Sequence, residues 1–261
     1  MGIAAEIAED WQAALAALVW QVEAGADEAM LDAPLNRYEL AAEAPKPATA
    51  HQASIAEQTP SLDPVDVARK VANAARTLTE LQTAIAGFDY CELKRGARNT
   101  VFADGNPAAR VLILGEAPGA DEDREGRPFV GRAGQLLDRM FAAIDLSRTG
   151  PDAKTALYIT NVMPWRPPGN RDPEPAEIAM MLPFVERHIA LVDPQVIVVL
   201  GNTPLFALTG SRGILRARGT WSEALGKPLL PMTHPAYLLR NPAAKREAWA
   251  DLLSLQARLR G

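Results

Sequence analysis

Four short apolar runs restrict the fold of this chain more than any other feature. They lie in its C-terminal two-thirds, at 109–114, 157–162, 196–200 and 229–232. Such runs are typical of strands that are buried on both faces of a parallel sheet. Between and after them, helical patterns occur at 131–144, 175–191, 203–208 and 242–260. This alternation predicts an α/β domain of three α/β/α layers around a central four-stranded parallel sheet.

The N-terminal third has a different character. Residues 3–24 carry an apolar face at helical spacing, and a stretch rich in Ala, Pro and Glu follows without any period. Asp63-Pro64 then opens a further helix, with proline in its first turn. We predict an N-terminal helix over 1–31, a flexible linker over 32–62, and a catalytic domain over 63–261 with a leading helix at 64–86.

Composition favours a cytoplasmic protein. The chain has one cysteine, Cys91, which excludes an intramolecular disulfide framework. It has no run of eighteen apolar residues, and its acidic N-terminus lacks the basic-then-apolar order of a secretory signal. We therefore expect no contact with a membrane.

The net charge of −5 is unevenly distributed. Residues 1–86 hold 13 acidic and 5 basic residues, a balance of −8, whereas the remaining residues hold 19 acidic and 22 basic ones, a balance of +3. The acidic excess belongs to the N-terminal region. The rest of the chain is mildly basic and rich in arginine, which permits contact with phosphates without requiring it.

Five glycines fall within residues 115–134, directly after the first apolar run. They let the backbone approach a ligand closely, although an ordinary glycine-rich loop has the same composition. The spacing Gly126-x4-Gly131 is like that of a phosphate-binding loop, but Arg132-Ala133 stands where that loop needs Lys followed by Ser or Thr. We therefore exclude nucleotide triphosphate hydrolysis, and the dinucleotide fingerprint G-x-G-x-x-G is also absent.

Polar residues also follow the second and fourth runs. Asn161 offers an amide donor and acceptor that can read the edge of a pyrimidine, although an Asn at this place can equally cap a turn. His234 precedes a proline at the end of the fourth run, a better place for chemistry than His51 in the linker or His188 in a helix. Since ligands bind at the carboxyl ends of parallel strands, we expect one site there.

Five segments carry a resemblance to a known family. They are Gly-Glu-Ala-Pro-Gly-x-x-Glu-Asp at 115–123, Gly-Arg-Pro-Phe-Val-Gly-Arg-Ala-Gly-Gln-Leu-Leu at 126–137, Thr-Asn-Val at 160–162, Arg-Pro-Pro-Gly-Asn-Arg at 166–171 and His-Pro-Ala-Tyr-Leu-Leu-Arg at 234–240. In order and spacing they resemble the family 4 uracil-DNA glycosylases over residues 88–260. The resemblance implies a base-excision-repair hydrolase that flips uracil out of DNA and cuts its N-glycosidic bond, leaving an abasic site. No lysine stands beside the motifs, so lyase activity is not expected.

The resemblance also implies roles for individual residues. Phe129 stacks on the flipped uracil, Asn161 reads its edge, and His234 stabilises negative charge on the leaving base. This last role agrees with the chemistry, because cleavage produces an anionic base that a hydrogen-bond donor stabilises. Gly115 and Ala117 are expected to line the uracil pocket.

Two assignments stay open at this point. The acidic residue that positions the water is Glu116 or Glu122, with Asp123 as a further candidate, and each of them can instead hold the loop. Leu238 or Leu239 is the wedge that fills the vacated base stack, with core packing as the alternative. The residues expected to contact DNA are Arg132, Arg171, Leu238, Leu239 and Arg240.

Family 4 enzymes carry a 4Fe-4S cluster on four cysteines, and here the chain departs from the family. The matching positions are Phe88, Cys91, Trp165 and Met181. One thiolate cannot hold such a cluster, and the three replacements are large and apolar, as filling its volume requires. We therefore expect no cofactor and no bound metal.

Other functions and partners are also considered. One alternative is a non-catalytic module with this fold that binds DNA damage or abasic sites. Another is a glycosylase preferring hypoxanthine or mispaired uracil, since the shape of the pocket decides base preference. Covalent attachment to DNA is not expected, because Asn161 runs into residues 162–171 without the histidine-containing insertion of the covalent relatives. The expected partner is uracil-containing DNA, single or double stranded, with a repair or replication protein as a further partner of the N-terminal region.

Overall fold

The computed structural model describes residue 15 and residues 63–260. The helix and linker predicted over 1–31 and 32–62 therefore lie almost wholly outside the described residues. No helix in the part of the chain that is described is both long and apolar enough to cross a membrane.

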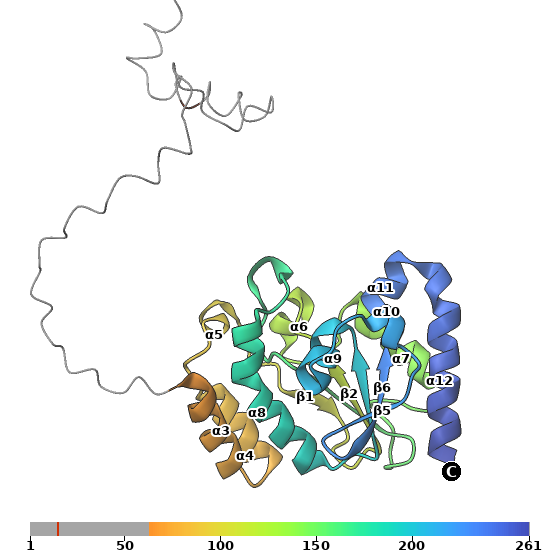
Figure 1. Ribbon diagram of the computed structural model, residues 1–261, viewed down its shortest axis with the longest axis horizontal. Coiled ribbons are helices and arrows are strands. Elements are labelled where there is room, and N and C mark those ends of the chain that lie inside the picture. Colours follow the sequence, from red (N-terminus) through yellow and green to blue (C-terminus); the bar gives the residue numbers. More distant parts are fainter. Residues whose placement is uncertain (1–14, 16–62, 261) are drawn as a thin grey trace, which may run out of the picture. The chain divides into compact units, whose positions relative to one another are not determined.

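A six-stranded sheet in the order β1-β3-β2-β4-β6-β5 organises the described residues (Figure 1). The strands are β1 (Ala103–Gly105), β2 (Val111–Gly115), β3 (Leu157–Asn161), β4 (Val196–Leu200), β5 (Ser222–Ala224) and β6 (Lys227–Met232). The four central strands are parallel and coincide with the four apolar runs. The prediction of four strands was wrong at the edges, because β1 and β5 pair antiparallel to their neighbours. Each edge strand has three residues, which is too short to show a hydrophobic period.

Helices cover both faces of the sheet, so the predicted three-layer architecture is confirmed. They are α3 (Pro64–Ala74), α4 (Leu78–Ala86), α5 (Leu93–Gly96), α6 (Ala120–Glu125), α7 (Arg132–Ala142), α8 (Pro175–Val192), α9 (Asn202–Thr209), α10 (Ile214–Ala217), α11 (Pro235–Arg240) and α12 (Lys245–Arg260), with 3-10 turns at Pro168–Asn170 and Pro242–Ala244. Figure 1 shows α3, α4 and α8 on one side of the sheet and α7 and α12 on the other. Alternate residues of β2 enter the two cores: Leu112 and Leu114 pack with α8, and Val111 and Ile113 pack with α7.

The leading helix predicted at 64–86 is two helices, α3 and α4. Ala75 adopts an extended backbone between them, and the Thr77 hydroxyl accepts a hydrogen bond from the Glu80 amide (3.1 Å) as the N-cap of α4. The Glu80 carboxylate accepts in turn from the Arg76 amide (2.6 Å). Local capping therefore breaks a run whose apolar period is continuous.

The register of the parallel strands aligns their carboxyl ends. Gly115 at the end of β2 lies opposite Asn161 at the end of β3, and Leu200 at the end of β4 lies opposite Met232 at the end of β6. The three polar segments named above therefore leave the sheet at one edge.

Candidate active site

An open cavity of about 690 Å³ lies at this carboxyl edge. That volume is within the range typical of small-molecule sites. Its lining includes Glu116, Ala117, Glu122, Phe129, Asn161, Arg171, His234 and Arg240. Three segments that are distant in the sequence thus meet at one cavity, as predicted.

Gly115 lets Phe129 and Asn161 meet behind this cavity. A Cβ atom added at Gly115 would lie 2.3 Å from Asn161 Oδ1 and 2.6 Å from the Phe129 ring. Phe129 itself has a φ of 54°, a left-handed conformation that is rare for a bulky residue. Holding it there costs about 1–3 kcal/mol, and such strain concentrates at functional sites.

Asn161 has unused bonding capacity. Its side chain is 7% exposed, and among the described residues its Oδ1 atom has no hydrogen-bond partner. A buried acceptor left in this state costs about 1–3 kcal/mol. A ligand N–H that reaches Oδ1 therefore satisfies an atom that the protein leaves unpaired.

His234 is the N-cap of α11, and its Nδ1 atom accepts a hydrogen bond from the Ala236 amide (3.1 Å). Burial, reinforced by the positive charge of Arg240, lowers the pKa of His234 to about 4. The ring is therefore neutral at pH 7, and because Nδ1 is the acceptor, Nε2 carries the proton. It stacks on Phe129 with ring centroids 5.5 Å apart, so the site has an N–H donor beside an aromatic platform.

The structure separates the acidic candidates. Glu122 is bonded through both oxygens: Oε1 accepts from the amides of Val130 and Gly131 (both 2.9 Å), and Oε2 accepts from the amide of Gly119 (3.1 Å). Asp123 accepts from the amides of residues 98 and 99 and so holds a neighbouring loop. Both carboxylates stabilise backbone conformation.

Glu116 differs from them. Its Oε2 atom accepts from the Thr203 hydroxyl (2.6 Å), and among the described residues no hydrogen bond reaches Oε1. Burial raises the pKa of Glu116 above its ordinary value, while the Thr203 bond opposes the shift. Sequence reasoning missed Thr203, although a hydroxyl three residues past a buried strand, at the carboxyl edge of the sheet, was a usable signal.

The residues expected to contact DNA differ in how far their side chains are exposed. Arg132 and Arg240 are exposed, and Leu239 is partly exposed. Leu238 is 0% exposed and packs against Leu136 and Ala248, as expected from the alternative of core packing.

Arg171 lies at the cavity through a different arrangement. Its guanidinium donates to both carboxylate oxygens of Glu177 (2.7 and 2.9 Å). This bidentate pair holds the cation near the cavity rather than leaving it free.

The fold and the site together define a protein class. Residues 102–253 match the family model of the Uracil DNA glycosylase superfamily, and the chain belongs to that superfamily. Within it, relatives are type-4 uracil-DNA glycosylases. The chain is 42% identical to the one from Thermotoga maritima over 154 residues (58% of this chain, 77% of the relative). It is 36% identical to that of Sulfurisphaera tokodaii (65% and 79%) and 37% identical to that of Archaeoglobus fulgidus (67% and 89%).

These relatives contradict the prediction that the protein has no cofactor, because type-4 enzymes are the iron–sulfur branch of the superfamily. That prediction relied on the three missing cysteines and on the large apolar residues that replace them. The four matching positions, Phe88, Cys91, Trp165 and Met181, are buried in one apolar cluster. They supply a single thiol, and burial raises the pKa of that thiol. The side chains at these positions do not fit a four-cysteine cluster.

Proposed function

We propose that this chain is a monofunctional uracil-DNA glycosylase, which flips uracil out of DNA and hydrolyses its N-glycosidic bond to leave an abasic site. The observation that carries the proposal is Asn161, which lines the cavity together with Phe129 and His234 and whose buried Oδ1 has no hydrogen-bond partner among the described residues. Extruding a base costs a few kcal/mol. Stacking on an aromatic ring such as Phe129 returns about 1–3 kcal/mol of it.

Asn161 selects the base by hydrogen-bond polarity. Uracil carries a proton on N3 and a carbonyl at C4, which match the acceptor Oδ1 and the amide donor of Asn161. Cytosine has no proton on N3 and carries an amine at C4, so it would leave Oδ1 unpaired and set donor against donor. A site built to hydrogen-bond a substrate strongly rejects the analogue that lacks the matching group.

His234 acts on the leaving base. As the N-glycosidic bond breaks, negative charge develops on the base and is shared with its O2 oxygen. The neutral ring donates from Nε2 to that oxygen, and one such preorganised donor supplies about 3 kcal/mol of transition-state stabilisation.

Glu116 positions the attacking water. Thr203 holds one carboxylate oxygen, which leaves Oε1 to accept a proton of a water aimed at the sugar carbon. Glu122 maintains the loop between α6 and α7 instead.

DNA reaches the site along the exposed rim of the cavity. Arg132 and Arg240 contact phosphates there, and Leu239 serves as the wedge that fills the vacated base stack. A cytoplasmic location and a repair or replication partner of the N-terminal region stay predictions.

The proposal is tested with a uracil-containing oligonucleotide, followed by treatment with alkali. The wild-type chain should produce alkali-labile sites, and His234→Ala and Asn161→Ala should abolish them. Oligonucleotides with hypoxanthine, or with uracil in mispairs, define the base preference. A protein that binds the uracil strand but yields no alkali-labile site would instead be a damage-binding module.

A further inference from the structure

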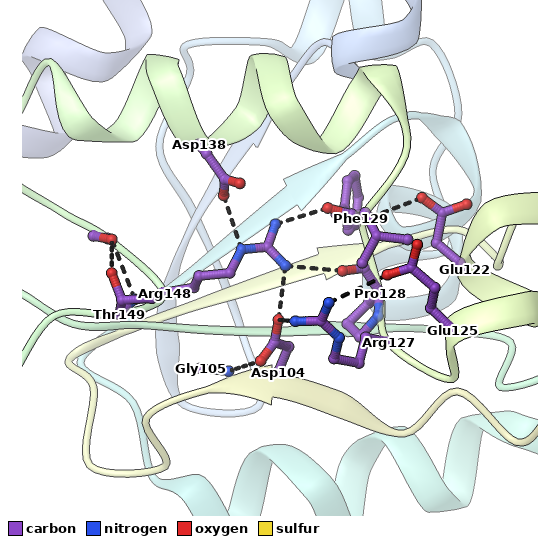
Figure 2. A network of polar contacts seen from close by, with 12 residues as sticks. Asp104, Gly105, Glu122, Glu125, Arg127, Pro128, Phe129, Asp138, Arg148 and Thr149 are labelled. Atoms are coloured by element: carbon purple, nitrogen blue, oxygen red, sulfur yellow. Dashed lines mark hydrogen bonds and ion pairs between the residues drawn. The ribbon is translucent and has the colours of Figure 1, made fainter.

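Arg148 lies outside every motif described above, in the connection between α7 and β3. Its guanidinium makes four hydrogen bonds: Nε donates to Asp138 (2.9 Å), Nη1 to Asp104 (2.9 Å) and to the Pro128 carbonyl (3.0 Å), and Nη2 to the Phe129 carbonyl (2.8 Å). Figure 2 shows the guanidinium between these groups. The side chain is 11% exposed, so it is directed at the protein and not at a phosphate.

The bonded carbonyls belong to the strained turn that carries the aromatic platform. Phe129 has its φ at 54°. A Cβ atom added at Gly134 would lie 1.8 Å from the Phe129 carbonyl oxygen, so the first turn of α7 abuts this peptide. On the other side of the turn, Glu122 accepts hydrogen bonds from the amides of Val130 and Gly131. Arg148 and Glu122 therefore hold the same turn, one by its carbonyls and the other by its amides.

We propose that Arg148 is a positioning residue for base excision: by binding the carbonyls of Pro128 and Phe129, it holds the Phe129 ring in the orientation on which the flipped base stacks. The inference rests on the proposed function, and it adds a residue that no motif contains. Arg148 itself touches no substrate. Asp104 and Asp138 hold the guanidinium in turn, and they come from β1 and α7.

The first experiment compares Arg148→Gln with Arg218→Gln. Arg218 is a matched control, because it is also largely buried and bonds Asp251 and the Glu247 carbonyl, away from the cavity lining. Both variants should lower the midpoint of urea unfolding. Only Arg148→Gln should lower kcat/KM for a uracil oligonucleotide, by about tenfold or more, since base stacking accounts for that range. Arg148→Lys, which keeps a donor, should restore part of the loss.

A double-mutant cycle tests whether Arg148 acts through the ring. If it does, Phe129→Ala and Phe129→Ala/Arg148→Gln should have the same kcat/KM. If the double variant instead loses kcat/KM by the product of the two single losses, the inference is overturned. A shift of about one in the slope of log Kd against log salt for Arg148→Gln would also overturn it, because that shift marks a lost phosphate contact.

Hydrogen exchange gives a readout that does not depend on activity. Exchange over residues 127–134 should accelerate in Arg148→Gln and stay at the wild-type rate in Arg218→Gln. Unchanged exchange in both variants would sink the inference. If the wild-type chain excises no uracil, the proposed function fails, while this comparison still decides whether Arg148 holds the turn.

Discussion

At the scale of single residues, hydrogen bonding separates the groups that we propose act on the substrate from the groups that hold the backbone. Asn161, Glu116 and His234 line the cavity, and among the described residues no hydrogen bond reaches Asn161 Oδ1, Glu116 Oε1 or His234 Nε2. Glu122 and Arg148 are instead bonded through both oxygens and all three nitrogens, respectively, and each of them holds the backbone of the Phe129 turn. Residue type alone does not reveal this difference, because both glutamates belong to the same motif.

The two glutamates should respond differently to the same substitution. Glu116→Gln should lower the single-turnover rate of excision about 100-fold, because an amide cannot orient the water as a carboxylate does. Its unfolding midpoint should stay near that of the wild type. Glu122→Gln should lower the midpoint, because an amide cannot accept through both of its terminal atoms. Equal rates for wild type and Glu116→Gln would remove Glu116 from the reaction.

The pH dependence of excision follows from the lowered pKa of His234 and the raised pKa of Glu116. His234, with a pKa of about 4, stays neutral above that pH and becomes protonated only below it. Protonation puts a hydrogen on Nδ1 opposite the Ala236 amide and breaks the bond that orients the ring. Glu116 protonates as the pH falls through a pKa raised above its ordinary value. Excision should therefore hold from pH 8 down to mildly acidic pH and fall below it.

Single-turnover rates between pH 4 and pH 8 check this expectation. In Glu116→Gln the remaining acid limb should belong to His234 and lie near pH 4. An acid limb near pH 6.5 in that variant would contradict the lowered pKa of His234.

At the scale of elements, a buried polar pair joins β3 to α8. The Tyr158 hydroxyl and His188 Nε2 lie 2.8 Å apart, and Phe102 stacks on the imidazole with centroids separated by 4.5 Å. Burial lowers the pKa of His188 to about 3. The sequence predicts only that His188 lies in a helix, and the structure places it in the interface between that helix and the sheet.

This pair should make stability depend on pH. An unfolded histidine titrates near pH 6.5, so between about pH 6.5 and 3 the unfolded chain binds a proton that the folded chain rejects. Stability contributed by neutral His188 is complete above pH 6.5 and is lost as the pH falls toward 3. Urea unfolding at several pH values should show this loss, and Tyr158→Phe/His188→Phe should make it shallower.

The single variant Tyr158→Phe is the control for this test. It leaves the imidazole buried without its partner, which costs about 1–3 kcal/mol at pH 7. Removing both polar groups together should cost less than that. An unchanged pH slope in the double variant would place the dependence elsewhere.

At the scale of the whole molecule, the local charge near the cavity is opposite in sign to the net charge of the chain. The chain carries −5, yet Arg240, which lines the cavity, and Arg132, next to the lining residue Ala133, are both exposed. Affinity for DNA should therefore depend on a local basic rim and fall steeply with salt.

Salt titrations of DNA binding test this view. Arg240→Ala should reduce the slope of log Kd against log salt by about one, because one phosphate contact is lost. Arg69→Ala, in an exposed arginine of α3 outside the cavity lining, should leave the slope unchanged. Equal slopes for Arg240→Ala and wild type would remove Arg240 from the DNA interface.

Most of the site was predictable from the sequence because its signals are local. A buried parallel strand is a continuous apolar run, and the residue at its carboxyl end lies at the sheet edge where ligands bind. Those two facts place Gly115, Asn161 and His234 together without coordinates. The edge strands were missed because three residues are too few to show a hydrophobic period. The break between α3 and α4 was missed because a helix cap interrupts an apolar period that is continuous in the sequence.

The hydrophobic pattern alone determined the three-layer fold and the meeting of the motifs. A continuous apolar run of neighbouring residues marks a buried parallel strand, and the residues that follow the run lie at the carboxyl edge of the sheet. Only the tertiary structure decided that Glu122 is bonded through both oxygens and Glu116 through one, that Leu238 is buried, and that Arg148 reaches the Phe129 turn. Each of these depends on hydrogen bonds or packing between segments far apart in the chain. Partners of that kind leave no period or spacing to read, so they become visible only when the chain is folded.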